Sequence, residues 1–111
     1  MADPTLPLAA LLGKGARYSG EMSFEGRVRV DGTFTGRIFT EDVLEVGEGG
    51  VVDGQVDAAT LIVAGLAKGD VRARDRLVLQ PTGRLEGKVD ARVLEVRPGG
   101  QIDAQVRSGA P

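Results

Sequence analysis

The sequence contains no cysteine, no histidine and no tryptophan. Without cysteine there are no disulfides, no thiol catalysis and no cysteine-bound metal, and without histidine the commonest general base and metal ligand are missing. Lysine and arginine number 14 against 16 aspartate and glutamate, so the basic excess of a general nucleic-acid binder is also missing. No apolar run approaches the roughly 18 residues of a membrane-spanning helix. We therefore expect no cofactor, no metal site and no direct nucleic-acid partner.

Glycine and small aliphatic residues dominate what is present. The 111 residues include 17 glycines and only 4% aromatic residues, yet 41% are hydrophobic. That apolar share is too high for a disordered chain. The length allows one domain, whose core must be built from valine, leucine, isoleucine and alanine.

A five-residue repeat organises the chain: an apolar residue, any residue, glycine, any residue, an apolar residue. The central positions of its last five copies are 36, 54, 69, 87 and 104, at steps of 18, 15, 18 and 17. Apolar residues alternate within each copy, which is typical of strands and not of helices. A unit of about 17 residues suits one coil of a β-solenoid, in which three short strands and three corners return the chain over its own start. The copies are YSGEM (18–22), FEGRV (24–28), FTGRI (34–38), VDGQV (52–56), AKGDV (67–71), LEGKV (85–89) and IDAQV (102–106).

Stacked coils would bring equivalent residues into columns. We expect Gly54, Gly69 and Gly87 to face inward, where a narrow cross-section leaves no room for side chains. An outward column would alternate in sign from coil to coil, which favours parallel, in-register stacking. Four charged positions alternate by chance about one time in eight, so this column supports the alignment without deciding it. The column is Asp57, Arg72, Asp90 and Arg107.

The stretch 12–38 resembles the bactofilins, a family of bacterial polymer-forming cytoskeletal proteins. The matching residues are Leu12-Gly13, Phe24-Glu25-Gly26, Val30-Asp31-Gly32 and Phe34-Thr35-Gly36. The resemblance implies a right-handed, three-sided parallel β-helix that assembles end to end into non-polar filaments without a nucleotide. In the family such filaments often contact the membrane and position cell-wall enzymes, chromosome-organising proteins or polarity factors. This sequence departs from the family in lacking both the apolar, lysine-containing N-terminal peptide and the phenylalanine that often marks the last coil.

These observations together predict an all-β, single-domain β-solenoid of about six coils with a triangular cross-section. Residues 14–107 would form the domain, residues 1–13 a flexible N-terminal segment and residues 108–111 a flexible tail. The protein would be a cytoskeletal scaffold, with itself and client proteins as partners. The alternative is a β-helix that does not polymerise and binds a protein partner or the membrane surface.

Neither end of the predicted solenoid has a convincing cap. The remnant after Val106 is too short for a capping helix, and the N-terminal piece is short and interrupted by proline. A bare β-stack leaves unpaired backbone groups and an apolar cross-section at each end. We therefore expect polymer contacts at Tyr18, Met22 and Phe24 at one end and at Val96, Ile102 and Val106 at the other.

An enzyme is the first rival interpretation. Acyltransferases built on left-handed β-helices have coils of similar length but rely on a catalytic histidine, which this chain lacks. Carboxylate pairs such as Asp53 and Glu86 would lie two coils apart on a flat side without an evident cleft. The sequence therefore predicts that the protein is not an enzyme.

Two further surfaces are candidates for contacts. Ile62 and Val78 should point outward and form a small exposed apolar strip for lateral bundling or a partner. Leu6, Leu8, Leu11 and Leu12 could touch a membrane, or could instead belong to a tail or cap. Asp3 and Pro4 stand where a secretory signal needs positive charge, which predicts a cytoplasmic protein, with association with the inner face of the cytoplasmic membrane left open.

Overall fold

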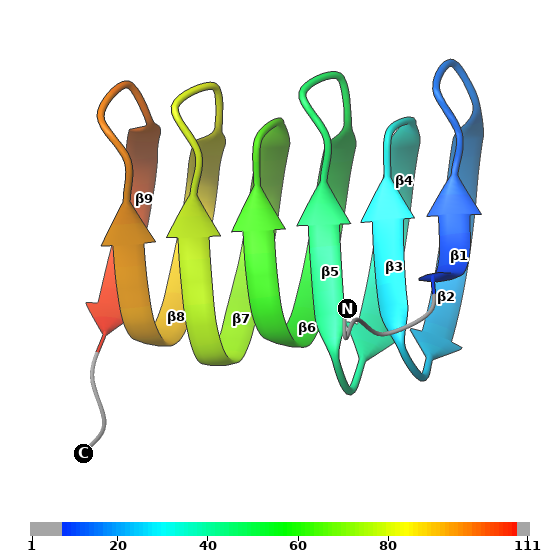
Figure 1. Cartoon of the computed structure of the whole chain (residues 1–111), viewed down its shortest axis with the longest axis horizontal. Helices are drawn as coiled ribbons and strands as arrows, with labels where there is room; N and C mark the ends of the chain where they lie inside the picture. The colour runs from blue at the N-terminus through cyan, green and yellow to red at the C-terminus, as the bar shows by residue number, and fades with distance from the viewer. Residues whose placement is uncertain (1–7, 109–111) are drawn as a thin grey trace.

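The computed structural model describes residues 8–108 as nine β-strands, and these residues contain no helix. All strand pairs are parallel, and six strands or strand segments stack in register in the order β2, β4, β6, β7, β8, β9. The chain thus winds as a β-solenoid of six coils, which confirms the predicted fold (Figure 1). The strands are β1 (Leu8–Leu12), β2 (Arg17–Phe24), β3 (Arg27–Val30), β4 (Thr33–Thr40), β5 (Val43–Val46), β6 (Val51–Val63), β7 (Leu66–Leu79), β8 (Arg84–Val96) and β9 (Gln101–Ser108).

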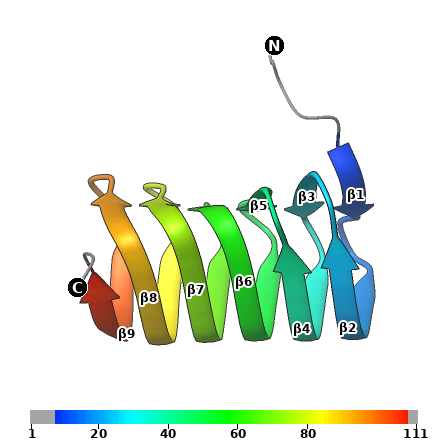
Figure 2. The ribbon, with the colours of Figure 1, turned by 90° about the horizontal axis from the view of Figure 1, so that it is seen from below.

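Each coil has three sides, which we name by their residues in β6. The first side holds residues 51–53, the second residues 55–58 and the third residues 60–63. A glycine separates the first side from the second, and a register shift separates the second from the third. A loop then leads to the next coil, and Figure 2 shows the coils side by side along the long axis. This confirms the stack of short strands and corners that the repeat predicted.

The core is a set of columns of small aliphatic side chains inside the coils. Val52, Ala67 and Leu85 form one column, and each is fully buried. Burial of a valine or leucine side chain contributes about 1.5–3 kcal/mol. Each coil holds only a few such side chains, so its stability depends on the coils above and below it.

Glycine is required at the corners for a different reason from the predicted one. Gly54 has a φ of +132°, a conformation that residues with a side chain rarely adopt. A Cβ added there would collide with the carbonyl oxygen of Gly36 in the preceding coil. The prediction of a narrow interior was therefore wrong: the missing side chain would point along the axis, toward the neighbouring backbone.

A segment before residue 14 also belongs to the solenoid. The structure places Leu8–Leu12 in β1, parallel to β3, and the carbonyl oxygen of Leu12 accepts hydrogen bonds from the N–H groups of Asp31 and Gly32 at 2.7 and 3.0 Å. Leu12 is only 5% exposed, because it continues the inward column of Val30 and Val46. The predicted flexible segment 1–13 therefore extends too far, and β9 likewise continues to Ser108. Leu6 and residues 109–111 lie outside the described part of the chain.

One bend is reinforced by an arginine that reaches over two other coils. Strand β7 has two residues, Arg74 and Asp75, where β6 and β8 have one. The Arg74 guanidinium donates a hydrogen bond to the carbonyl oxygen of Thr40 at 2.6 Å and lies 5.0 Å from the centre of the Phe39 ring. Its Nε also lies 3.2 Å from a carboxylate oxygen of Asp57, at ion-pair distance but without hydrogen-bond geometry. The Arg74 side chain therefore links three coils.

Replacement of a corner glycine should be strongly destabilising. We expect Gly54→Ala to lower the free energy of unfolding by about 2–4 kcal/mol, because it combines backbone strain with a clash against the neighbouring coil. The thermal midpoint should fall by about 10 °C or more. Gly49→Ala is the matched control, because no atom lies closer than 4.0 Å to its added Cβ and its φ is ordinary. Thermal unfolding followed by circular dichroism at equal protein concentrations measures both, and equal midpoints would contradict this explanation.

Loss of the Arg74 contacts should lower the stability of the solenoid by less than replacement of Gly54 does. We expect Arg74→Ala to destabilise the solenoid by about 1–2 kcal/mol, because a charged hydrogen bond and a cation–π contact are lost at a partly exposed site. Arg92 occupies the same bend in the next coil and is exposed, so Arg92→Ala should change stability by less than about 0.5 kcal/mol. Urea unfolding of the two variants gives the comparison, and a similar cost for both would show that the link is not specific.

Candidate functional site

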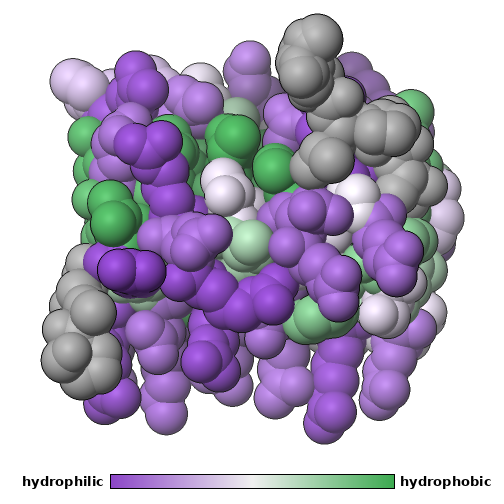
Figure 3. All heavy atoms as spheres, turned by 60° about the horizontal axis from the view of Figure 1, so that its bottom comes forward, coloured by the Kyte–Doolittle hydropathy of each residue, from purple (hydrophilic) through white to green (hydrophobic). Residues whose placement is uncertain are grey.

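The C-terminal end of the solenoid exposes the apolar column that is buried elsewhere. Val96, Ile102 and Val106 are 45%, 37% and 40% exposed. Their equivalents one coil earlier, Leu79, Leu85 and Val89, are buried. The difference arises because no further coil among the described residues covers these three side chains. The three residues predicted for this end therefore lie on the same open cross-section, and Figure 3 shows apolar surface along this edge, at its left.

Strand β9 also leaves one backbone edge open. It pairs with β8 through residues 101–108, and no other described strand pairs with it. Unpaired N–H and C=O groups along such an edge are a template for another strand. The C-terminal end thus combines an apolar cross-section with unused hydrogen-bonding groups.

Val93 lies at the same end and was missed by sequence reasoning. It is 48% exposed, on the outer surface of the third side. The corresponding positions in the preceding coils are polar, Thr60 and Arg76. The change from polar to apolar in the last coil was the signal that could have revealed it.

The N-terminal end is formed by β1 and β2. Tyr18, Met22 and Phe24 all lie on β2 and pack, half-buried, against the core. Among the described strands β2 pairs only with β4, so its other edge is open. A Cβ added at Gly20 would meet nothing within 4 Å, whereas at the equivalent Gly36 it would meet the backbone of Gly20 in the preceding coil. The structure therefore brings the second predicted group together at the opposite open end.

The predicted apolar strip on the third side is largely covered. Val78 is only 9% exposed and Ile62 is half-buried, so the expectation of an exposed strip was wrong for Val78. Glu95 lies beside Val78 in the next coil, and its carboxylate is 3.5 Å from the Arg76 guanidinium. This diagonal ion pair places polar side chains around the apolar position.

Charged groups are also paired further along the third side. Arg27 donates a hydrogen bond to Glu45 at 3.1 Å, and Arg29 donates one to Asp31 at 3.0 Å. The bond from Arg29 to Asp31, more than any other contact, raises the pKa of Arg29 above its ordinary value. Much of the charge on this side is therefore already satisfied within the chain.

The leucines predicted for membrane contact are divided by the structure. Leu12 belongs to the core, which is at odds with a membrane role, whereas Leu11 is 54% exposed on the outer surface of β1. Leu8 begins β1, and Leu6 lies outside the described residues. No helix among the described residues is long and apolar enough to cross a membrane.

Residues 8–108 contain no group of three or more acidic side chains arranged to hold a metal ion. The two hollows found on this part of the surface are open grooves between side chains of neighbouring coils. What the geometry does provide is a stack whose two ends carry unsatisfied surface, as expected for a subunit of a linear polymer.

Comparison with known proteins identifies the class. Residues 10–107 match the bactofilin family model, described as polymer-forming cytoskeletal. The chain therefore belongs to the bactofilin family, as the resemblance of residues 12–38 predicted, and is a polymer-forming cytoskeletal protein.

Individual relatives agree with this assignment. The chain is 26% identical over 102 residues to bactofilin BacO of Myxococcus xanthus, covering 92% of this chain and 81% of that protein. It is 34% identical to the Thermus thermophilus bactofilin in double helical filaments, with a TM-score of 0.85 over 90% of this chain and 99% of that one. A crystal structure of a phenylalanine-to-arginine mutant of the Thermus bactofilin matches with a TM-score of 0.75 and 34% identity, over 80% of this chain and 99% of that one.

Proposed function

We propose that this protein assembles end to end, without a nucleotide, into filaments that position other proteins in a bacterial cell, and that two such filaments pair. The observation that carries this proposal is the exposure of Val96, Ile102 and Val106 on an end whose equivalent residues are buried in the preceding coil. The double helical filaments of the Thermus relative support the pairing of filaments. The scaffold is not an enzyme in this proposal, and its action is to hold clients in place.

The chemistry of the ends favours stacking of subunits. A coil of a second molecule would cover the three apolar side chains, and burial of their exposed area would contribute about 1 kcal/mol each. It would also pair the open edge of β9 with a strand edge, either of β1 and β2 or of another β9. The contact needs no nucleotide, because each contribution comes from surface already present on the folded subunit.

A charge at the C-terminal end should stop assembly. We expect Ile102→Arg to convert long filaments into short soluble species, because it would place a guanidinium in the apolar contact. Gln101→Arg is the matched control: it adds the same charge to the neighbouring, outward-facing position of the same strand. Negative-stain electron microscopy and sedimentation compare the two. Long filaments from both variants would contradict this contact, and a wild-type protein that stays an 11.6 kDa monomer would favour the non-polymerising binding module.

Weak membrane association is a second candidate function, supported by the exposure of Leu11. An isolated leucine binds a bilayer weakly, but a filament repeats it many times and so multiplies the effect. We expect Leu11→Ser to reduce co-sedimentation of filaments with liposomes by at least a few fold. Val93→Ser, which removes a similarly exposed side chain at the opposite end, is the control. Equal binding of both variants and the wild type would exclude Leu11 as a membrane contact.

A further inference from the structure

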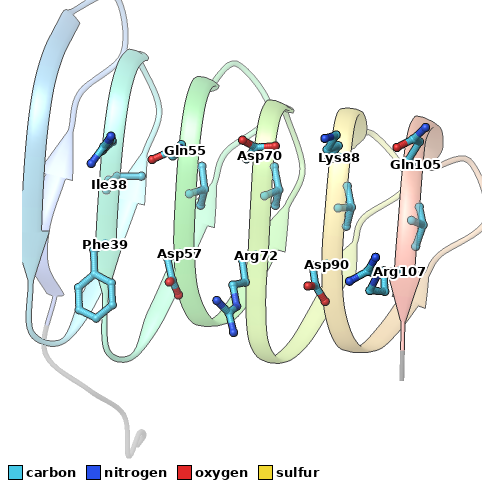
Figure 4. A pocket seen from close by; sticks show the side chains of 15 residues that line it. Ile38, Phe39, Gln55, Asp57, Asp70, Arg72, Lys88, Asp90, Gln105 and Arg107 are labelled. Atoms are coloured by element: carbon cyan, nitrogen blue, oxygen red, sulfur yellow. The ribbon is translucent and has the colours of Figure 1, made fainter. Parts of the chain in front are cut away.

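The second side of the solenoid carries two rows of polar side chains with a shallow groove between them, and all of them are exposed except Asp57, which is half-buried beside Arg74 (Figure 4). Within the last four coils, both rows run along the long axis with one residue from each coil, in the register fixed by β6, β7, β8 and β9. The first row is Gln55, Asp70, Lys88 and Gln105. The second row is the predicted alternating column of Asp57, Arg72, Asp90 and Arg107, which the strand register confirms.

The charges at the centre of these rows have no ion-pair partner among the described residues. Among residues 8–108, none of the ion pairs involves Arg72, Lys88 or Asp90, and all three are exposed. The third side differs, because Glu45 and Glu95 are already paired there. The second side therefore offers charge that another molecule can meet.

The order of these charges is self-complementary. Consider a two-fold axis that lies in the plane of contact, perpendicular to the long axis, midway between β7 and β8. It places β6 opposite β9 of a second copy and β7 opposite β8. In the alternating row, Asp57 then faces Arg107 of the second copy, and Arg72 faces Asp90. In the other row Asp70 faces Lys88, and Gln55 faces Gln105, two amides that can bond to each other. Every charged residue of β6 to β9 in these rows meets an opposite charge, as an isologous contact requires.

We propose that the second side is the surface through which two filaments of this chain pair, with their subunits antiparallel. The first side is a poorer candidate, because the same axis would put Asp53 opposite Asp103. A parallel arrangement would place the two rows against each other within one coil. It would bring Asp70 to Arg72 and Lys88 to Asp90, four opposite-charge contacts against six in the antiparallel pair. The proposal rests on the proposed end-to-end assembly and names the lateral partner surface of that assembly.

The size of this side explains why pairing would need filaments. Four coils span roughly 19 Å and four residues of a strand roughly 13 Å, so the contact offers about 250 Å² per subunit. A stable pair of single proteins usually needs about 800 Å² from each partner. Two separate subunits would therefore not remain together, whereas two filaments add the same weak contact at every subunit.

A high salt concentration should disrupt the pairing of filaments but not their end-to-end assembly. Charge pairs at an exposed surface weaken as the screening length falls from about 10 Å at 0.1 M salt to about 3 Å at 1 M, whereas apolar end contacts persist. We expect electron microscopy to show paired filaments at about 0.1 M salt and single filaments at about 1 M. Pairing that is unchanged at high salt would overturn the proposal.

A charge swap tests the geometry. Arg72→Asp puts a carboxylate opposite Asp90 of the second copy, so at low salt we expect single filaments. In the double variant Arg72→Asp/Asp90→Arg, opposite charges face each other again in the antiparallel pair, and we expect paired filaments. Within one molecule, the same double variant puts like charges in neighbouring coils. In a parallel pair, it would put like charges opposite each other. Recovery of pairing therefore supports the antiparallel contact, and single filaments from the double variant overturn it.

The control is Arg84→Asp, which makes the same change of charge on the first side and should leave filaments paired. Circular dichroism of each variant checks that the solenoid is folded. Wild-type filaments that stay single at every salt concentration would overturn the lateral contact and the proposed pairing of filaments, and would leave end-to-end assembly standing. A wild-type protein that forms no filaments would overturn the proposed function, and the lateral contact with it.

Discussion

The structure depends on one constraint: every strand of a parallel stack needs a neighbour on each edge. Strand β7 has β6 on one edge and β8 on the other, and its inward side chains are covered from both directions. Strand β9 has a neighbour on one edge only. The hydrogen bonds and apolar contacts that hold coils together inside the molecule are therefore the same ones that remain unused at its ends. In the proposed filament, the interactions that stabilise the fold would also join the subunits, so the ends would need no specialised binding residues.

The column of corner glycines makes this close stacking possible. In each glycine the missing Cβ would point along the axis at the backbone of the preceding coil, as for Gly69 against Gly54. The column begins at Gly20, where that direction is open. The N-terminal end thus presents the same bare backbone to solvent that each inner coil presents to its neighbour, and an approaching strand meets no side chain there.

Sequence patterns predicted the parts of this structure that repeat. The spacing of Gly54, Gly69 and Gly87 was enough to align the coils, and the register of β6, β7 and β8 agrees with it residue by residue. It was not enough to locate the extra residue in β7. A step of 18 from Gly69 to Gly87 can be met by a longer loop or by an added residue at a bend, and only three-dimensional packing places it at Arg74.

Features outside the repeat were missed for a related reason. Strand β1 lacks the glycine motif, so the spacing of that motif could not predict the pairing of β1 with β3. The cover over Val78 depends on the diagonal contact between Arg76 and Glu95, which lie in different coils and 19 residues apart. Alternation along one strand correctly assigned Val78 to the outer surface, but it carries no information about which long side chains bend over that surface.

The distribution of charge separates the ends from the sides. The two open ends are apolar, whereas the second side alternates in sign and the whole chain has a net charge of only −2. A filament built from strongly charged subunits would repel a second filament along its whole length. Mixed signs in each row avoid that repulsion and also disfavour displacement by one coil, which would bring like charges together in the alternating row. In the proposed assembly, growth along the axis would therefore use apolar surface and backbone edges, and association across it would use the order of charges.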